Sequence, residues 1–206
     1  MTLIEKRLEI VNNETINFRQ KNWSELLRPC GVKILSSFSN PQIDAYLLSE
    51  SSLFVFAHHF ILITCGGGNP LRLLEQAPFP GKGIQYHYEE RGLEGVKNFT
   101  LESKTSWLEI FSVEDAQCNE IFSGDLAEQI RNIETFLNLK NKWPGFQFQN
   151  HLFEPRGYSV NGIQGENYLS IHWSFEEGHN LLSIESSESF RTSPRPFPTL
   201  GEGNFS

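Results

Sequence analysis

The chain has 206 residues, of which 38% are hydrophobic and 13% aromatic, proportions that are ordinary for a folded globular protein. Its net charge of −8 arises entirely in residues 51–206, which hold 19 acidic and 11 basic side chains. This balance argues against a partner that is a nucleic acid, because binding it needs a basic surface. No run of about 18 apolar residues occurs, so we expect neither a membrane-spanning helix nor a membrane partner.

The first part of the chain is predicted to form strands with two short helices. Residues 1–11 fit a helix or an edge strand, and residues 23–27 predict a short helix closed by Pro29. Strands are expected over 32–38 and 45–48, on either side of a turn at Asn40-Pro41. Runs rich in β-branched and aromatic residues at 53–57 and 60–64 predict a hairpin with His58 and His59 at its turn. Pro70 begins a further helix.

The second part alternates further strands with one clear helix. Strands are predicted over 84–88, 107–111, 147–153, 168–175 and 181–185. Between Ser123 and Leu139 apolar residues repeat at helical spacing, and Asp125 and Glu128 favour the N-terminus of that helix. We therefore expect a single domain over residues 1–185, followed by a disordered tail of Ser, Pro and Gly over 186–206.

The three cysteines suggest where the protein works. Cys30, Cys65 and Cys118 are an odd number and have no metal-ligand spacing, so we expect no metal site and a reducing, cytoplasmic setting. The N-terminal sequence also carries charges where a signal peptide needs an apolar core.

Two blocks of sequence resemble the S-adenosylmethionine decarboxylases, pyruvoyl enzymes of polyamine synthesis. The first block is LSESSLFV at 48–55 with TCG at 64–66, and the second is FEPRGYSVNG at 153–162 with YLSIH at 168–172. The resemblance implies an α+β fold, an αββα sandwich of antiparallel β-sheets covered by helices, whose first strand would be residues 1–11. This chain is shorter than the family, with a segment missing between about 91 and 107 and an early end after 185. The second half would then be incomplete, or completed in a homodimer or by a full-length paralogue.

The resemblance also implies self-cleavage between Glu50 and Ser51. The Ser51 hydroxyl would attack the Glu50 carbonyl, and elimination would leave a covalent pyruvoyl group on residue 51 as the cofactor, whose ketone forms an imine with the substrate amine. By resemblance Ser159 assists the oxyanion, His172 is the base and Cys65 is the acid that returns a proton to the substrate. Thirteen residues separate Ser159, beside a Gly-Tyr turn, from His172 in a strand, so the two could meet across one sheet. Taken singly, such residues are more often core or turn residues.

The expected substrate is a small molecule of amino-acid type. By resemblance Phe153 stacks on adenine, Glu176 holds the ribose hydroxyls, and Glu50 also binds substrate. Of the family's N-terminal F-E-G-x-E-K motif only the second glutamate remains, as Glu5, which we count among the catalytic residues. Arg156 replaces a small residue of the family pattern and could grip a carboxylate or repel a sulfonium.

An amine effector site is implied at three glutamates, Glu9, Glu109 and Glu185, where eukaryotic family members bind putrescine. Two departures weaken it, since Thr105 stands where an aspartate is usual and Ile63 where a lysine is usual. The alternative is that the glutamates are solvated or locally paired.

Two other functions stay open at this point. The eroded N-terminal motif and Arg156 are compatible with a pyruvoyl-dependent decarboxylase of L-ornithine or L-arginine. The short second half is compatible with a non-catalytic regulatory paralogue, although a scaffold has no need of Ser51, Cys65, Ser159 and His172 together.

Overall fold

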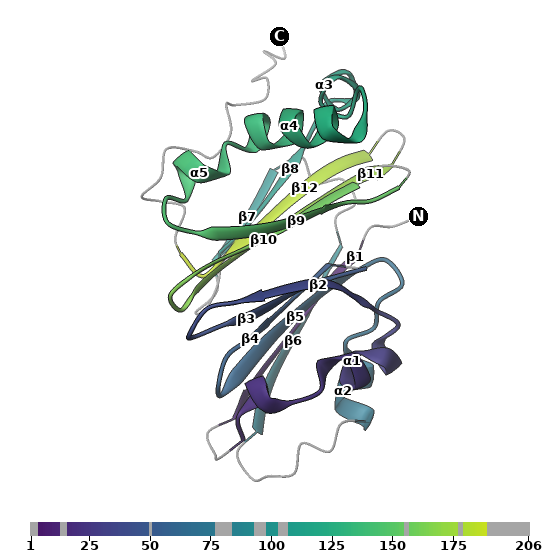
Figure 1. Ribbon diagram of the computed structural model, residues 1–206. Helices are drawn as coiled ribbons and strands as arrows, with labels where there is room; N and C mark the ends of the chain where they lie inside the picture. The colour runs from purple at the N-terminus through teal and green to yellow at the C-terminus, as the bar shows by residue number, and fades with distance from the viewer. Residues whose placement is uncertain are drawn as a thin grey trace.

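The protein is an αββα sandwich of two six-stranded antiparallel sheets, with helices on the outer face of each sheet (Figure 1). The computed structural model describes residues 4–12, 16–49, 51–76, 84–92, 98–102, 107–154, 157–176 and 179–188. The expected α+β class is confirmed.

The first sheet comes from the N-terminal part of the chain and has the order β2-β3-β4-β5-β1-β6. Helices α1 (Trp23–Leu27) and α2 (Leu71–Gln76) cover its outer face, together with the 3-10 turns η1 (Phe18–Gln20) and η2 (Arg28–Cys30). Its strands are β1 (Ile4–Asn12), β2 (Ile34–Ser39), β3 (Asp44–Leu48), β4 (Ser51–Val55), β5 (His59–Cys65) and β6 (Ile84–Gly92).

The second sheet comes from the C-terminal part and has the order β7-β8-β12-β11-β10-β9. Helices α3 (Asp115–Ile121), α4 (Leu126–Leu137) and α5 (Leu139–Lys142) lie over its outer face (Figure 1). Its strands are β7 (Asn98–Glu102), β8 (Trp107–Ser112), β9 (Gln147–Leu152), β10 (Gly157–Gln164), β11 (Asn167–Glu176) and β12 (His179–Ser186).

Among the described residues, three buried apolar clusters hold these layers together. One lies between sheet and helices in the first half, and another between sheet and helices in the second half. The third joins the two sheets face to face and includes Phe54, Ile61 and Ile163. Side chains alternate between the faces of a strand, so β1 gives Leu8 and Ile10 to the outer cluster and turns Glu5, Arg7 and Glu9 between the sheets.

The strand positions correct several expectations from the sequence. β1 is not an edge strand, because it pairs with both β5 and β6. The stretch expected to hold a turn beside Ser159 is instead the continuous strand β10, and neither β7 nor α3 was predicted. Helix α4 begins as expected, with a capping box between Asp125 and Glu128, but Leu126 at its start is exposed.

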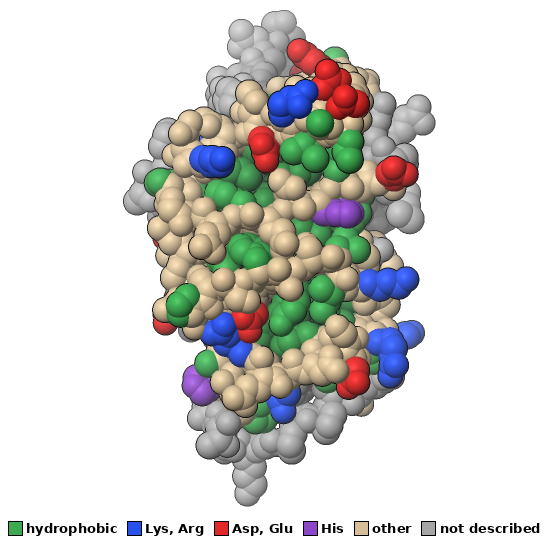
Figure 2. Space-filling view, in the orientation of Figure 1, with side chains coloured by type: hydrophobic (Ala, Val, Ile, Leu, Met, Phe, Trp, Pro, Cys, Tyr) green, Lys and Arg blue, Asp and Glu red, His purple; other side chains and the backbone are tan. Residues whose placement is uncertain are grey.

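The tail expected from residue 186 begins differently. Ser186 ends β12, and Ser187 still donates a hydrogen bond from its backbone N–H to the carbonyl of Tyr168, whereas residues 189–206 lie outside the described part. Within the described ranges, no helix is long and apolar enough to cross a membrane. Figure 2 shows acidic side chains gathered near α3 and α4, and apolar side chains in the seams between helices and sheets.

Candidate active site

A hydrogen-bonded group of three side chains joins the two sheets at one end of the sandwich. His172 lies within hydrogen-bond distance of Ser159 through Nδ1 (2.7 Å to Oγ) and of Cys65 through Nε2 (3.2 Å to Sγ). A neutral imidazole carries one proton, so the ring donates one of these bonds and accepts the other. His172 can therefore exchange a proton with either neighbour.

The strand register explains why these residues meet. Ser159 on β10 and His172 on β11 are a cross-strand pair, so their side chains point from the same face of the second sheet. Cys65 ends β5 in the first sheet, and the chain turns away at Gly66 with a φ of +59°. Lys6 fixes that turn by donating to the Gly68 carbonyl at 2.9 Å.

Ser51 lies beside this group with an unusual backbone. It pairs with Thr64, the neighbour of Cys65, across β4 and β5. Its φ is +135°, a conformation that L residues rarely adopt and that costs about 1–3 kcal/mol. Its hydroxyl is buried and finds no hydrogen-bond partner among the described residues. A strained residue with an unengaged hydroxyl suits an internal nucleophile. Glu50, which precedes Ser51 at the expected cleavage site, lies outside the described residues.

Glu5 approaches the same group from β1. It pairs with Cys65 across β1 and β5, and its carboxylate accepts a hydrogen bond from the Ser183 hydroxyl at 3.1 Å. Ser183 in turn is the cross-strand partner of His172 on β12. Two neighbouring residues of the first sheet thus contact two neighbouring residues of the second sheet. The sequence did not single out Ser183, because a serine in a strand carries no motif.

The environment of His172 sets its protonation. Burial lowers the pKa of His172 from 6.5 to about 4, so the imidazole is neutral at physiological pH and available as a base. If the chain cleaves itself with His172 as the base, as the resemblance implies, the cleavage rate should change less than about twofold between pH 7 and pH 5.5, because His172 protonates only near pH 4. An ordinary histidine would lose about 90% of its basic form over that range. Time courses of cleavage in buffers of constant ionic strength measure this, and a tenfold fall by pH 5.5 would contradict it.

The expected substrate residues are placed only in part. Phe153 follows β9, its backbone N–H donates to the Gly157 carbonyl at 2.8 Å, and its half-buried ring meets His151 edge-on at a centroid distance of 4.6 Å. Gly157 lies two residues before Ser159, so Phe153 is near the histidine group. Glu176 ends β11 four residues beyond His172, with only its backbone described, and Arg156 lies outside the described residues.

Comparison with known proteins agrees with the resemblance noted in the sequence. The family model for adenosylmethionine decarboxylase matches residues 4–77 and 92–197. The chain belongs to the adenosylmethionine decarboxylase family. It is similar to S-adenosylmethionine decarboxylase proenzyme 2 of Arabidopsis thaliana, with 24% identity over 79% of this chain and 60% of that protein. Proenzyme 1 of the same plant is 26% identical over 88% of this chain and 68% of its own length, and proenzyme 1 of Brassica juncea is 25% identical over 79% and 60%. The chain thus spans about 60% of the first relative's length.

A second polar cluster occupies the place where the family resemblance implied an amine site. Arg7, buried on β1, donates from Nε to Glu185 at 2.8 Å and from Nη1 to Glu9 at 3.0 Å. Tyr168 donates its hydroxyl to the same Glu185 oxygen at 2.8 Å. Burial alone would lower the pKa of Arg7, but Glu185 and Glu9 raise it above its ordinary value, so Arg7 stays charged.

The sequence alone does not predict that Arg7 pairs with Glu9 and Glu185. Glu5, Arg7 and Glu9 alternate in charge on one face of β1, a pattern that usually marks a solvated strand, and here that face is buried between the sheets. The third expected glutamate, Glu109, lies on β8 opposite Ile184, and only its backbone is described. The alternative of locally paired glutamates is therefore seen for Glu9 and Glu185. Thr105 lies outside the described residues.

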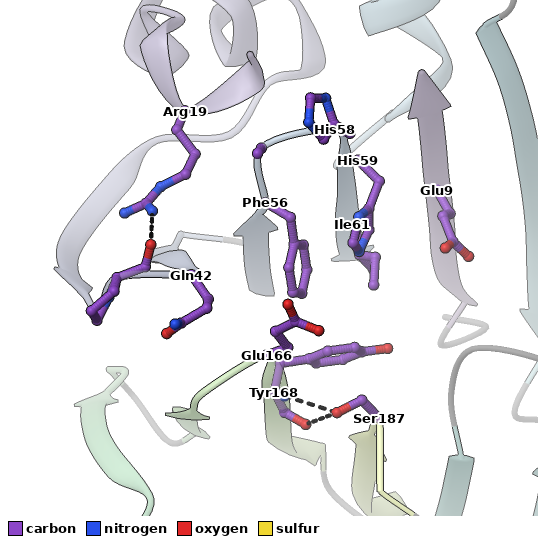
Figure 3. Close-up of a pocket in the computed structure, with 12 residues that line it drawn as sticks. Glu9, Arg19, Gln42, Phe56, His58, His59, Ile61, Glu166, Tyr168 and Ser187 are labelled. Carbon is purple, nitrogen blue, oxygen red and sulfur yellow. Dashed lines mark hydrogen bonds between the residues drawn. The ribbon is translucent and has the colours of Figure 1, made fainter. Parts of the chain in front are cut away.

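A cavity of about 480 Å³ opens near this cluster, at the other end of the strands that carry Cys65 and His172. Figure 3 shows Glu9 on β1 at one side of the lining, and Glu166 and Tyr168 below Phe56 and His59. His59 stacks on Phe56 at a centroid distance of 3.9 Å. Neither Cys65 nor His172 lines this cavity, so it is separate from the candidate active site.

For the processing and decarboxylation that the resemblance implies, we predict that putrescine changes either rate by less than about twofold, roughly 0.4 kcal/mol of coupling. The reason is that Arg7 already supplies Glu9 and Glu185 with a cation and two charge-assisted hydrogen bonds. Both rates, measured with and without millimolar putrescine, test this. A tenfold rise in either rate would show that an amine still acts, and spermidine at equal ionic strength is the control for charge screening.

Proposed function

We propose that the chain is the precursor of a decarboxylase that acts on S-adenosyl-L-methionine in the biosynthesis of the polyamines spermidine and spermine. The observation that carries the proposal is the hydrogen-bonded group of Cys65, His172 and Ser159 beside the strained Ser51. The names of the relatives, S-adenosylmethionine decarboxylase proenzymes, support both the substrate and the processing of a precursor.

Processing would begin with attack of the Ser51 hydroxyl on the Glu50 carbonyl carbon. A C–O ester bond forms, the C–N peptide bond breaks, and the Ser51 nitrogen takes up a proton. The Ser159 hydroxyl is suited to stabilise the oxyanion that develops during the attack, since its distance to Nδ1 of His172 allows a bond that fixes its orientation.

Elimination then needs a base. Neutral His172 removes the α-proton of residue 51, the Cβ–O bond breaks, and residues 1–50 leave as a carboxylate. The dehydroalanine that remains takes up water and releases ammonia, which gives the pyruvoyl group. The site fits a pyruvoyl group, because the buried Ser51 hydroxyl has no hydrogen-bond partner among the described residues. Its removal in the reaction would break no described hydrogen bond.

Once formed, the pyruvoyl ketone would supply the electron sink that decarboxylation of an amino acid requires. The roles proposed for this chain's own residues rest on the family resemblance, and the contacts of Cys65 and Glu5 support them. Cys65 returns a proton to the substrate carbon, and Glu5 beside it keeps the Ser183 hydroxyl oriented. Phe153 stacks on the adenine, and Glu50 and Glu176 complete the binding site.

Release of labelled CO₂ from carboxyl-labelled substrates tests this function. We expect release from S-adenosyl-L-methionine and none above background from L-ornithine or L-arginine. CO₂ release from L-ornithine or L-arginine but not from S-adenosyl-L-methionine would reassign the substrate. If processed protein released CO₂ from none of these three compounds, the result would favour a non-catalytic regulatory paralogue.

A further inference from the structure

A chain of buried hydrogen bonds links the strand that begins at Ser51 to the opposite sheet. Ser170 donates its hydroxyl to the Ser52 oxygen at 2.9 Å, and Ser52 donates to the side-chain oxygen of Asn161 at 2.6 Å. Asn161 donates from Nδ2 to the Tyr46 carbonyl on β3 at 2.9 Å. All three polar side chains are at most 4% exposed, so their hydrogen bonds form without competition from water.

The position of this chain is what suggests a role. Asn161 and Ser170 form a cross-strand pair two positions along β10 and β11 from Ser159 and His172, so both pairs point from the same face. Ser52 is the residue directly after Ser51. Ser52 is therefore adjacent in sequence to the proposed nucleophile, Ser51. Its partner Asn161 lies two positions along β10 from Ser159, which pairs with the proposed base, His172.

Stability alone gives a weak reason for such a chain. The apolar cluster of Phe54, Ile61 and Ile163 already joins the two sheets. Buried hydrogen bonds between neutral groups add only about 0.5–1.5 kcal/mol each, because the same groups bond to water when unfolded. Their directionality is much greater than that of apolar contacts, which suits them to fixing the register of two strands.

We infer that Ser52 and Asn161 are positioning residues for the self-cleavage reaction, and this inference rests on the function proposed above. Their hydrogen bond fixes the backbone on the C-terminal side of Ser51 relative to Ser159 and His172. The rotation about the N–Cα bond of Ser51 then takes up the strain, which is seen as its φ of +135°. Removing the bond lets the strand relax away from the geometry of attack, and displacements of about 1 Å in such geometry cost about 100-fold in rate.

The test compares Ser52→Ala with Ser186→Ala. Ser186 is an equally buried serine whose hydroxyl donates to the Tyr168 carbonyl and accepts from the Glu188 backbone N–H, both at 3.1 Å, and neither bond involves β4. Cell-free synthesis with a pulse label gives cleavage rates, and melting temperatures are measured in a Ser51→Ala background, where no cleavage interferes. Uncleaved chains are also treated with hydroxylamine, which splits an accumulated ester.

We expect the two variants to lose similar melting temperature, while only Ser52→Ala slows cleavage, by about tenfold. Its uncleaved chain should resist hydroxylamine, because the attack that forms the ester is slowed rather than the elimination. Ser52→Thr, which keeps the hydroxyl, should recover most of the rate. Should Ser52→Ala fail to fold, Ser170→Ala leaves the Ser52–Asn161 bond in place and should slow cleavage about two- to threefold.

Cleavage of Ser52→Ala at the wild-type rate, or equal slowing in Ser186→Ala, would overturn the inference while leaving the proposed function intact. An uncleaved wild-type chain would instead contradict the proposed processing itself.

Discussion

Wild-type protein should appear on a denaturing gel as two fragments, residues 1–50 and 51–206, with the larger fragment blocked at its N-terminus. The reason lies in the backbone of Ser51, where a rarely populated φ of +135° raises the energy of the precursor, and in its buried hydroxyl, which has no described partner to give up before it attacks. Intact-mass measurement of the larger fragment should show a pyruvoyl group in place of serine.

Substitutions of Ser51 and Ser49, which lie in the same motif, distinguish loss of the nucleophile from a general disturbance of the structure. Ser51→Ala should stay intact at all times, because no nucleophile remains. Ser49→Ala should cleave as wild type does, since the Ser49 hydroxyl accepts a hydrogen bond from the Lys33 backbone N–H at 3.0 Å and the substitution leaves Ser51 in place. A single wild-type band with a free N-terminal methionine would rule out self-processing.

The second large effect is that substitutions of Cys65 and His172, which are hydrogen-bonded to each other, should impair different reactions. Loss of Cys65 should impair decarboxylation, and loss of His172 should impair cleavage. Cys65→Ala should cleave within about threefold of the wild-type rate, since it removes one hydrogen bond to His172, but should lose at least about 100-fold in decarboxylation. His172→Ala should instead stop before elimination and accumulate an ester, which hydroxylamine splits. Fragment analysis and CO₂ release on the same preparations measure both.

Cys118→Ala is the matched control for the thiol. Cys118 is fully buried in α3, away from His172, so its loss should leave both rates unchanged. If Cys65→Ala blocks cleavage and His172→Ala does not, the roles assigned to the two residues are wrong.

The sequence predicted the fold class and most strands because the apolar and β-branched runs are long and bounded by Gly, Pro or Asn. It also predicted that Ser159 and His172 could meet, and they form a cross-strand pair. The error at β10 has a physical cause. Glycine before tyrosine predicts a turn from sequence alone, whereas Gly157 begins β10 and lies against Phe153 and the Trp173 carbonyl.

Contacts between the sheets could not be predicted in this way. The hydrogen bonds of Arg7 to Glu185 and of Ser52 to Asn161 join residues more than 100 positions apart, and no local pattern encodes such pairs. Alternation on β1 showed which residues share a face, but whether that face meets water or the other sheet is decided by tertiary packing.

The place of β1 in the first sheet has a consequence for the processed protein. The proposed cleavage after Glu50 would place β1 to β3 in one polypeptide and β4 to β12 in another, while β1 lies paired between β5 and β6. The precursor folds as one chain, at any dilution. A processed molecule that has been denatured must reassemble from two separate chains, so its recovery depends on concentration. The working lifetime of such a two-chain molecule would be governed by how slowly it unfolds.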